Sequence, residues 1–281
     1  MRAEKIKITF IGGGNMASAL ISGLMQQGYS AEQINVVEID AERRNRIKET
    51  FGISVMSDLT DGISQSGKEN ELNVIVLAVK PQQIQTIAHH IAGLLKHHLI
   101  ISIAAGIRVI DIMRWLDGYP RVIRAMPNTP SFVRAGLTGL YAAPVTSELD
   151  RCSAESILSA VGTVFWVDDE EMLHTVTAIS GSGPAYVFYF IESMQQAGIK
   201  LGLTLEQSRR LSLQTFLGAV KLASESHDDV SVLREKVTSK GGTTQKAIQS
   251  MEDGNVKNSI IAAIEASYAR SREMSDEYGE M

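Results

Sequence analysis

The sequence predicts an α/β protein in which a doubly wound parallel sheet is followed by an all-helical domain. Three observations lead to this fold class. Short apolar runs alternate with helical stretches over residues 1–166, a glycine-rich segment follows the first run, and strand-like runs vanish beyond residue 167. Such alternation is typical of βαβ units, in which a helix connects each pair of parallel strands. We therefore expect two domains, residues 1–166 and residues 167–281.

The expected strands are short runs rich in β-branched and other apolar residues. Leu72–Val79 is nearly continuous in its apolar character, as in a parallel strand that is covered on both faces. The other expected strands are Ile6–Ile11, Ile34–Ile39, Leu99–Ala104 and Arg121–Met126, and the first two helices are Asn15–Gln27 and Ala41–Phe51.

The second half of the chain reads as helices, and one of them lacks a polar face. The segment Tyr186–Ile191 is apolar on every side of the expected helix. Such a helix must be buried in a core or against another subunit, so we expect at least a homodimer. The expected helices here are Glu170–Thr177, Ala185–Leu201, Leu205–Ser224 and Val256–Glu273.

Composition narrows the class of protein. Hydrophobic residues make up 44% and charged residues 21%, the balance of an ordinary soluble globular protein. The net charge of −5 and the lack of a basic run disfavour nucleic acid as a partner. We expect neither a signal peptide nor a membrane span, and the single Cys152 suits a reducing cytosol, so we expect a cytoplasmic protein. The pairs His89-His90 and His97-His98 lack the i,i+4 spacing of a helical metal site, so no metal is expected.

A dinucleotide-binding fingerprint lies between the first strand and the first helix. In the segment Phe10–Ala17, Gly12 permits the tight turn, Gly14 lets the backbone approach a pyrophosphate, and Ala17 allows close packing of helix on strand. The start of the helix then offers free N–H groups to the phosphates. The fingerprint therefore predicts that this βαβ unit binds a dinucleotide cofactor.

The end of the second strand leaves the choice between NADPH and NADH open. An acid at this place bonds the ribose 2′-hydroxyl of NADH, and Glu38 is such an acid. Arg43 and Arg44, one turn into the next helix, suit the 2′-phosphate of NADPH or form a solvated helix face.

Five further segments resemble one family over nearly the whole chain. They are Leu77–Pro81, Ser102–Gly106, Arg124–Pro130, Ser180–Tyr186 and Ser239–Thr244. Their order and spacing resemble those of pyrroline-5-carboxylate reductases. The resemblance implies a Rossmann domain, a helical dimerisation domain, and hydride transfer from NADPH or NADH to 1-pyrroline-5-carboxylate, which yields L-proline in the last step of proline biosynthesis.

The resemblance also implies which residues form the site. Thr244 is expected to be catalytic, through a hydrogen bond to the ring nitrogen of the substrate. Ser182 is expected to cap a helix that starts at Pro184, and Lys240 departs from the proline common in the family. The expected substrate-binding residues are Ser180, Ser182, Gly183, Ser239, Gly241, Gly242 and Thr243. The expected cofactor-binding residues are Ile11, Gly12, Gly13, Gly14, Asn15, Met16, Glu38, Ala78, Val79, Lys80, Pro81, Ile103, Ala104, Ala105 and Asn128.

Two other functions fit this sequence less well. β-Hydroxyacid dehydrogenases and imine reductases share the general plan, but the hydroxyacid enzymes carry a lysine one turn into the helix after their central glycine motif, and none follows Gly183 here. A cofactor-binding sensor without chemistry gives no reason for the segment Gly241–Thr244.

Overall fold

The computed structural model describes residues 6–64 and 72–280, which form two compact units. Unit 1 comprises Met1–Ser182 and Ser267–Met281, and unit 2 comprises Gly183–Ala266. The boundary predicted at residue 166 follows the last strand of the sheet, whereas the compact units divide after Ser182. The N-terminal residues up to Lys5, which entered the signal-peptide prediction, lie outside the described residues.

Unit 1 contains one eight-stranded sheet, so the predicted α/β fold class is confirmed. The strand order is β3-β2-β1-β4-β5-β6-β7-β8, and every neighbouring pair is parallel except β6 and β7. The five predicted strands are present as β1 (Ile6–Ile11), β2 (Ile34–Val37), β4 (Leu72–Leu77), β5 (Leu99–Ser102) and β6 (Val122–Met126). The sequence did not predict β3 (Ser54–Met56), β7 (Gly136–Ala142) and β8 (Gly162–Trp166).

The antiparallel strand β7 follows from the short connection before it. Residues 127–135 hold only one turn of 3₁₀ helix, and a parallel crossover needs a dozen or more residues. Gly139 in the middle of β7 makes room for α7 (Met172–Val176), because a Cβ there would lie 2.8 Å from Val176. This glycine also weakens the strand signal in the sequence.

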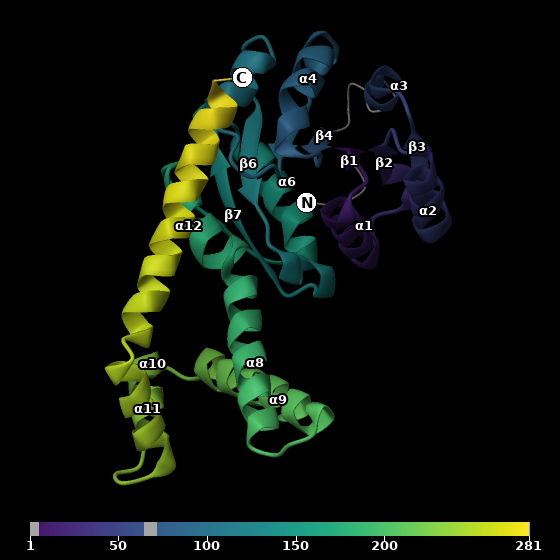
Figure 1. Ribbon diagram of the computed structural model, residues 1–281. Coiled ribbons are helices and arrows are strands. Elements are labelled where there is room, and N and C mark those ends of the chain that lie inside the picture. The colour runs from purple at the N-terminus through teal and green to yellow at the C-terminus, as the bar shows by residue number, and fades with distance from the viewer. Residues whose placement is uncertain (1–5, 65–71, 281) are drawn as a thin grey trace. The chain divides into compact units, whose positions relative to one another are not determined.

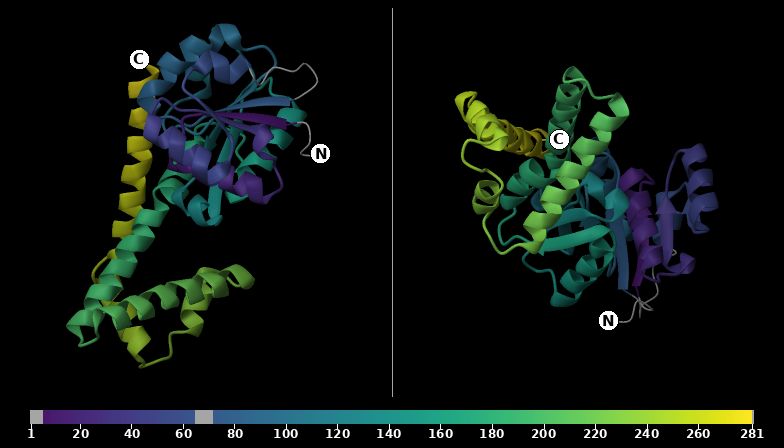
Figure 2. Two further views of the ribbon diagram at one scale, coloured as in Figure 1. Left: turned by 90° about the vertical axis from the view of Figure 1, so that its right-hand side faces the viewer. Right: turned by 90° about the horizontal axis from the view of Figure 1, so that it is seen from below.

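Helices cover both faces of the sheet (Figures 1 and 2). Neighbouring strand residues contribute to cores on opposite faces. Phe10 belongs to the core beneath α1 (Asn15–Gln26) and α6 (Glu148–Leu158), whereas Ile11 belongs to the core on the other face. The remaining helices up to residue 176 are α2 (Ala41–Phe51), α3 (Leu59–Ser64), α4 (Pro81–Ile91), α5 (Val109–Trp115) and α7 (Met172–Val176).

Unit 2 is helical, as predicted, and exposes much of its apolar surface. Ile191 is the one buried residue of α8, while Phe188 and Tyr189 are 66% and 69% exposed. Its helices are α8 (Gly183–Lys200), α9 (Leu205–Glu225), α10 (Val230–Lys236) and α11 (Thr243–Asp253), and α12 (Val256–Gly279) begins here and ends in unit 1. None of the helices that the structure describes is long and apolar enough to cross a membrane.

Candidate functional site

A cleft of about 820 Å³ lies at the carboxyl ends of β1, β2 and β4. The order of connections in the sheet reverses between β1 and β4, and ligands of doubly wound sheets bind at such a crevice. The cleft is lined by Ile11, Gly12, Gly14, Asn15, Val37, Glu38, Ile39, Asp40, Arg43, Leu59, Ala78, Val79, Lys80, Gln82, Gln83, Thr86 and Ile87.

The glycine loop leaves its backbone open to this cleft. Gly12 has a φ of +97°, and a Cβ there would lie 2.7 Å from the carbonyl oxygen of Ala78, so only glycine fits. A Cβ on Gly14 would meet no atom within 4 Å. Gly14 is the N-cap of α1, so no side chain caps the start of this helix, and its first turn contains no acidic residue. The free N–H groups and the positive end of the helix dipole can therefore hold a pyrophosphate, so these residues fit a dinucleotide.

Glu38 follows β2 at the floor of the cleft and is 6% exposed. Its Oε2 accepts a hydrogen bond from the N–H of Gly13 at 2.9 Å, and its Oε1 accepts one from the N–H of Asp40 at 2.9 Å. Burial alone raises the pKa of this carboxyl group, but the two backbone hydrogen bonds and the Arg43 guanidinium outweigh it, and the net pKa is lowered. Glu38 is therefore ionised at neutral pH.

The two arginines of α2 differ in position. Arg43 lines the cleft, pairs with Glu38 at 3.1 Å, and keeps its side chain 48% exposed. Arg44 is tied to the backbone, because its Nη1 donates to the carbonyl oxygens of Glu38 and Ile39 at 2.9 and 2.7 Å. Arg43 is thus the arginine placed to meet a cofactor phosphate.

Part of the predicted cofactor set lines the cleft, and part lies elsewhere. Gly106, which ends the segment Ser102–Gly106, lies against α12, since a Cβ there would be 3.1 Å from Tyr278. The predicted residues that line the cleft are Ile11, Gly12, Gly14, Asn15, Glu38, Ala78, Val79 and Lys80, and those that do not are Gly13, Met16, Pro81, Ile103, Ala104, Ala105 and Asn128.

The first turn of α4 was missed as a cleft wall. Gln82, Gln83 and Thr86 line the cleft, and they follow Pro81 at the first position of the helix. Residues three and four apart share a helix face, so Gln82 or Gln83 and Thr86 lie on one side of α4. Because α4 begins just after the carboxyl end of β4, the sequence could have indicated that this side faces the cleft.

Ser180 and Ser182 belong to a wide helical turn, and the predicted cap at Ser182 is wrong. Thr177–Gly181 is π-helical, and the N–H of Ser182 donates to the carbonyl of Thr177 at 2.8 Å. Ser182 keeps right-handed helical dihedral angles, so the chain passes from α7 through this turn into α8. Its hydroxyl instead lies 3.0 Å from the hydroxyl of Ser267. Such π-turns inside helices are often found at functional sites.

The second predicted substrate segment opens α11 in unit 2. Gly241 has a φ of +74°, and its N–H donates to the side chain of Gln245 at 2.6 Å. A Cβ on Gly242 would lie 2.7 Å from the hydroxyl of Ser239. Gly242 caps the helix without a side-chain bond, so the N–H groups of Thr243 and Thr244 stay available to an anion. Thr244 itself is half-buried.

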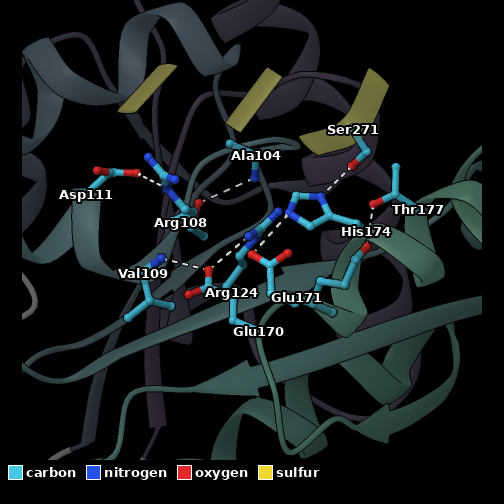
Figure 3. A network of polar contacts seen from close by, with 12 residues as sticks. Ala104, Arg108, Val109, Asp111, Arg124, Glu170, Glu171, His174, Thr177 and Ser271 are labelled. Atoms are coloured by element: carbon cyan, nitrogen blue, oxygen red, sulfur yellow. Dashed lines mark hydrogen bonds and ion pairs between the residues drawn. The ribbon is translucent and has the colours of Figure 1, made fainter. Parts of the chain in front are cut away.

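A buried ionic network lies beneath α12 in unit 1 (Figure 3). Arg124 in β6 is 2% exposed, and its Nη1 lies 2.8 Å from Oε1 of Glu170, which also accepts the N–H of Val109 at 2.8 Å. His174 is buried beside this pair, and its Nδ1 lies 2.8 Å from the hydroxyl of Ser271 on α12. Burial, and next the charge of Arg124, lower the pKa of His174. An arginine inside the apolar run Val122–Met126 was the signal in the sequence for a buried charge pair.

Comparison with protein families matches both parts of the chain. Residues 170–274 match the family described as pyrroline-5-carboxylate reductase dimerisation, and residues 7–106 match the family described as NADP oxidoreductase, coenzyme F420-dependent.

Individual relatives are similar over nearly their full length. The pyrroline-5-carboxylate reductase of Pseudomonas aeruginosa is 42% identical, with 98% of each chain covered. A solved pyrroline-5-carboxylate reductase from Coxiella burnetii has a TM-score of 0.88 at 41% identity, with 96% of this chain and 99% of that chain covered. The Plasmodium falciparum pyrroline carboxylate reductase with NADP bound has a TM-score of 0.84 at 30% identity, covering 96% and 98%. The chain therefore belongs to the family of pyrroline-5-carboxylate reductases, the NAD(P)H-dependent oxidoreductases that reduce 1-pyrroline-5-carboxylate to L-proline.

Proposed function

We propose that the cleft at the ends of β1, β2 and β4 binds the NADPH or NADH of this reaction. The observation that carries the proposal is the glycine loop, in which Gly12 and Gly14 leave the uncapped start of α1 open to the cleft. The N–H groups of Asn15 and Met16 are free for the pyrophosphate. Glu38 and Arg43 stand where the adenosine ribose of a Rossmann-bound cofactor lies.

We propose that the start of α11 binds the substrate carboxylate and that the hydroxyl of Thr244 forms a hydrogen bond with the ring nitrogen of the substrate. The free N–H groups after Gly242 and the helix dipole favour an anion. The cofactor supplies a hydride to the C=N carbon of the substrate. Positioning dominates such a step, because a protonated imine is already electrophilic. A threonine hydroxyl is a poor acid at its ordinary pKa, so Thr244 orients the ring by a hydrogen bond rather than donating a proton.

The protein works as a homo-oligomer in the cytoplasm. The match of residues 170–274 to a dimerisation family and the exposed apolar side chains of α8 and α9 support pairing with a second copy. The free Cys152 is exposed and fits a reducing compartment. Cell fractionation tests the location, and light scattering at micromolar concentration tests the assembly, for which a monomeric mass is the contrary result.

The activity is tested by following nicotinamide absorbance with three mixtures. These contain 1-pyrroline-5-carboxylate, a β-hydroxyacid in the oxidative direction, or the cofactor alone. Turnover with the cyclic imine alone is expected. Turnover with the hydroxyacid would favour a hydroxyacid dehydrogenase, and tight cofactor binding without turnover would favour a sensor.

A further inference from the structure

The turn that carries Ser180 and Ser182 contains a carbonyl group whose regular α-helical donor is missing. In a regular α-helix, the carbonyl oxygen of Ser180 accepts the N–H of the residue four positions on. That residue is Pro184, which has no N–H. Ser180 is half-buried, and a carbonyl that is shielded from water without a donor costs free energy, so a donor from another element stabilises this turn.

Asn128 supplies it from the loop after β6. Its Nδ2 donates to the carbonyl oxygen of Ser180 at 3.0 Å, and its Oδ1 accepts the N–H of Leu137 at the start of β7 at 2.9 Å. Asn128 is 9% exposed, so water competes little for either bond. One amide therefore joins the turn to the sheet.

The surroundings make this join stiff. Pro127 and Pro130 flank Asn128 and Thr129 and restrict the backbone on both sides. Met126, the last residue of β6, packs against the turn, because a Cβ on Gly181 would lie 2.8 Å from its methyl group. The loop after β6 thus sets where Ser180 and Ser182 stand relative to the sheet that carries the cofactor cleft.

We propose that Asn128 is a positioning residue for the substrate, acting through the Ser180 carbonyl rather than by contact with the cofactor. The inference rests on the proposed function of Ser180 and Ser182 as substrate-binding residues. Loss of the bond lets the turn shift, which weakens substrate binding and leaves the dinucleotide cleft intact.

The first experiment compares Asn128→Ala with the wild-type enzyme. We expect KM for 1-pyrroline-5-carboxylate to rise roughly tenfold, the scale set by one lost buried hydrogen bond. The Kd for NADPH, measured by fluorescence titration of the enzyme without substrate, is expected to stay within about twofold, far below that tenfold step. A weaker Kd for NADPH with an unchanged KM would overturn the inference and make Asn128 a cofactor-binding residue.

A second pair of variants separates the hydrogen bond from general damage to the fold. Pro184→Ala restores an N–H four residues after Ser180, so the double variant Asn128→Ala, Pro184→Ala should regain much of the lost substrate affinity, relative to Pro184→Ala alone. Pro120→Ala, a proline in another loop, is the control and should restore nothing. If Asn128→Ala raises KM by the same factor with Pro184 as with Ala at that position, the proposed role of the Ser180 carbonyl is contradicted.

Two further measurements keep the test decisive if Asn128→Ala folds poorly or if the wild-type protein shows no activity. Asn128→Asp keeps the acceptor for Leu137 but, when ionised, cannot donate to Ser180, so it should reproduce the KM effect. Hydrogen exchange of the peptide over residues 177–183 should speed up in both variants, whether or not the enzyme is active. A wild type without turnover of the imine would refute the proposed function, whereas unchanged exchange and KM in an active enzyme would refute the role of Asn128.

Discussion

The carboxylate of Glu38 accepts a hydrogen bond from the backbone N–H of Gly13 at 2.9 Å. The acid at the end of β2 therefore braces the phosphate loop after β1, in addition to any contact with a ribose. A Cβ on Gly13 would collide with the side chain of Ile47 and would lie 3.4 Å from the carboxylate, so the loop is packed tightly here. Removal of Glu38 would loosen the loop and change cofactor choice together, and Arg43 is the cleaner probe of that choice.

Arg43→Gln should raise the Kd for NADPH relative to that for NADH. Arg43 is half-exposed in the cleft and can meet a 2′-phosphate, and its loss also frees the Glu38 carboxylate for a ribose diol. A lost charged hydrogen bond corresponds to roughly tenfold or more in the ratio of the two Kd values. Arg46→Gln, on the exposed side of the same helix, is the control for net charge. Equal ratios in both variants would show that Arg43 does not face the cofactor.

Glu38→Ser should lower the Kd for NADPH relative to that for NADH, the opposite of the effect of Arg43→Gln. It should also lower the melting temperature of the cofactor-free protein.

Gly14→Ala should abolish cofactor binding while leaving the cofactor-free protein stable. Its φ of −69° suits alanine, and the added Cβ meets no protein atom within 4 Å, so it enters the space needed by the pyrophosphate. Gly12→Ala is the contrasting variant, because a Cβ there collides with Ala78 at a positive φ and should destabilise the fold itself. Melting curves with and without NADPH measure both effects. Normal NADPH binding by Gly14→Ala would contradict the assigned position of the pyrophosphate.

Stability should fall as the pH drops from about 6.5 to about 4, and His98 should contribute to that fall. Burial, followed by the charge of Arg121, lowers the pKa of His98 from 6.5 to about 4. Because the unfolded chain takes up a proton in this window and the folded chain does not, protonation favours unfolding there. The melting temperature of His98→Asn should therefore fall less between neutral and mildly acidic pH than that of the wild type. His97→Asn, an exposed neighbour, should behave like the wild type. Identical pH profiles for all three proteins would refute this role.

Thr244→Ala should lower kcat/KM by about tenfold to over a hundredfold, with cofactor affinity nearly unchanged. One hydrogen bond to a charged group is worth roughly 1.5–3 kcal/mol, which sets this range. Thr244→Ser keeps the hydroxyl and should recover much of the loss, whereas Thr244→Val keeps the shape and should not. A valine variant as active as the wild type would show that the backbone of the loop acts alone. Gly242→Ala, which crowds the Ser239 hydroxyl, should then raise KM.

The fold was predictable where local sequence and tertiary packing agree. Leu72–Leu77 is buried on both faces, so its apolar run could be read directly as a central parallel strand. The glycine loop was equally clear, because Gly12 requires a backbone conformation that only glycine adopts easily. The strand Gly136–Ala142 was not predictable, since its two glycines allow close packing against residues far away in the sequence, Val161 and Val176.

The sequence by itself determined the family resemblance, the order of βα units and the cleft residues that directly follow strands. Tertiary structure alone decided that Glu38 binds Gly13, that Ser182 joins a π-helical turn to α8, and that Asn128 donates to Ser180. Glu38 and Gly13 lie 25 positions apart, and Asn128 and Ser180 lie 52 positions apart. The conformation of Ser182 depends on how one helix continues into the next. Local propensity carries no information about such partners. They are set by which buried donors and acceptors the packed chain leaves to satisfy.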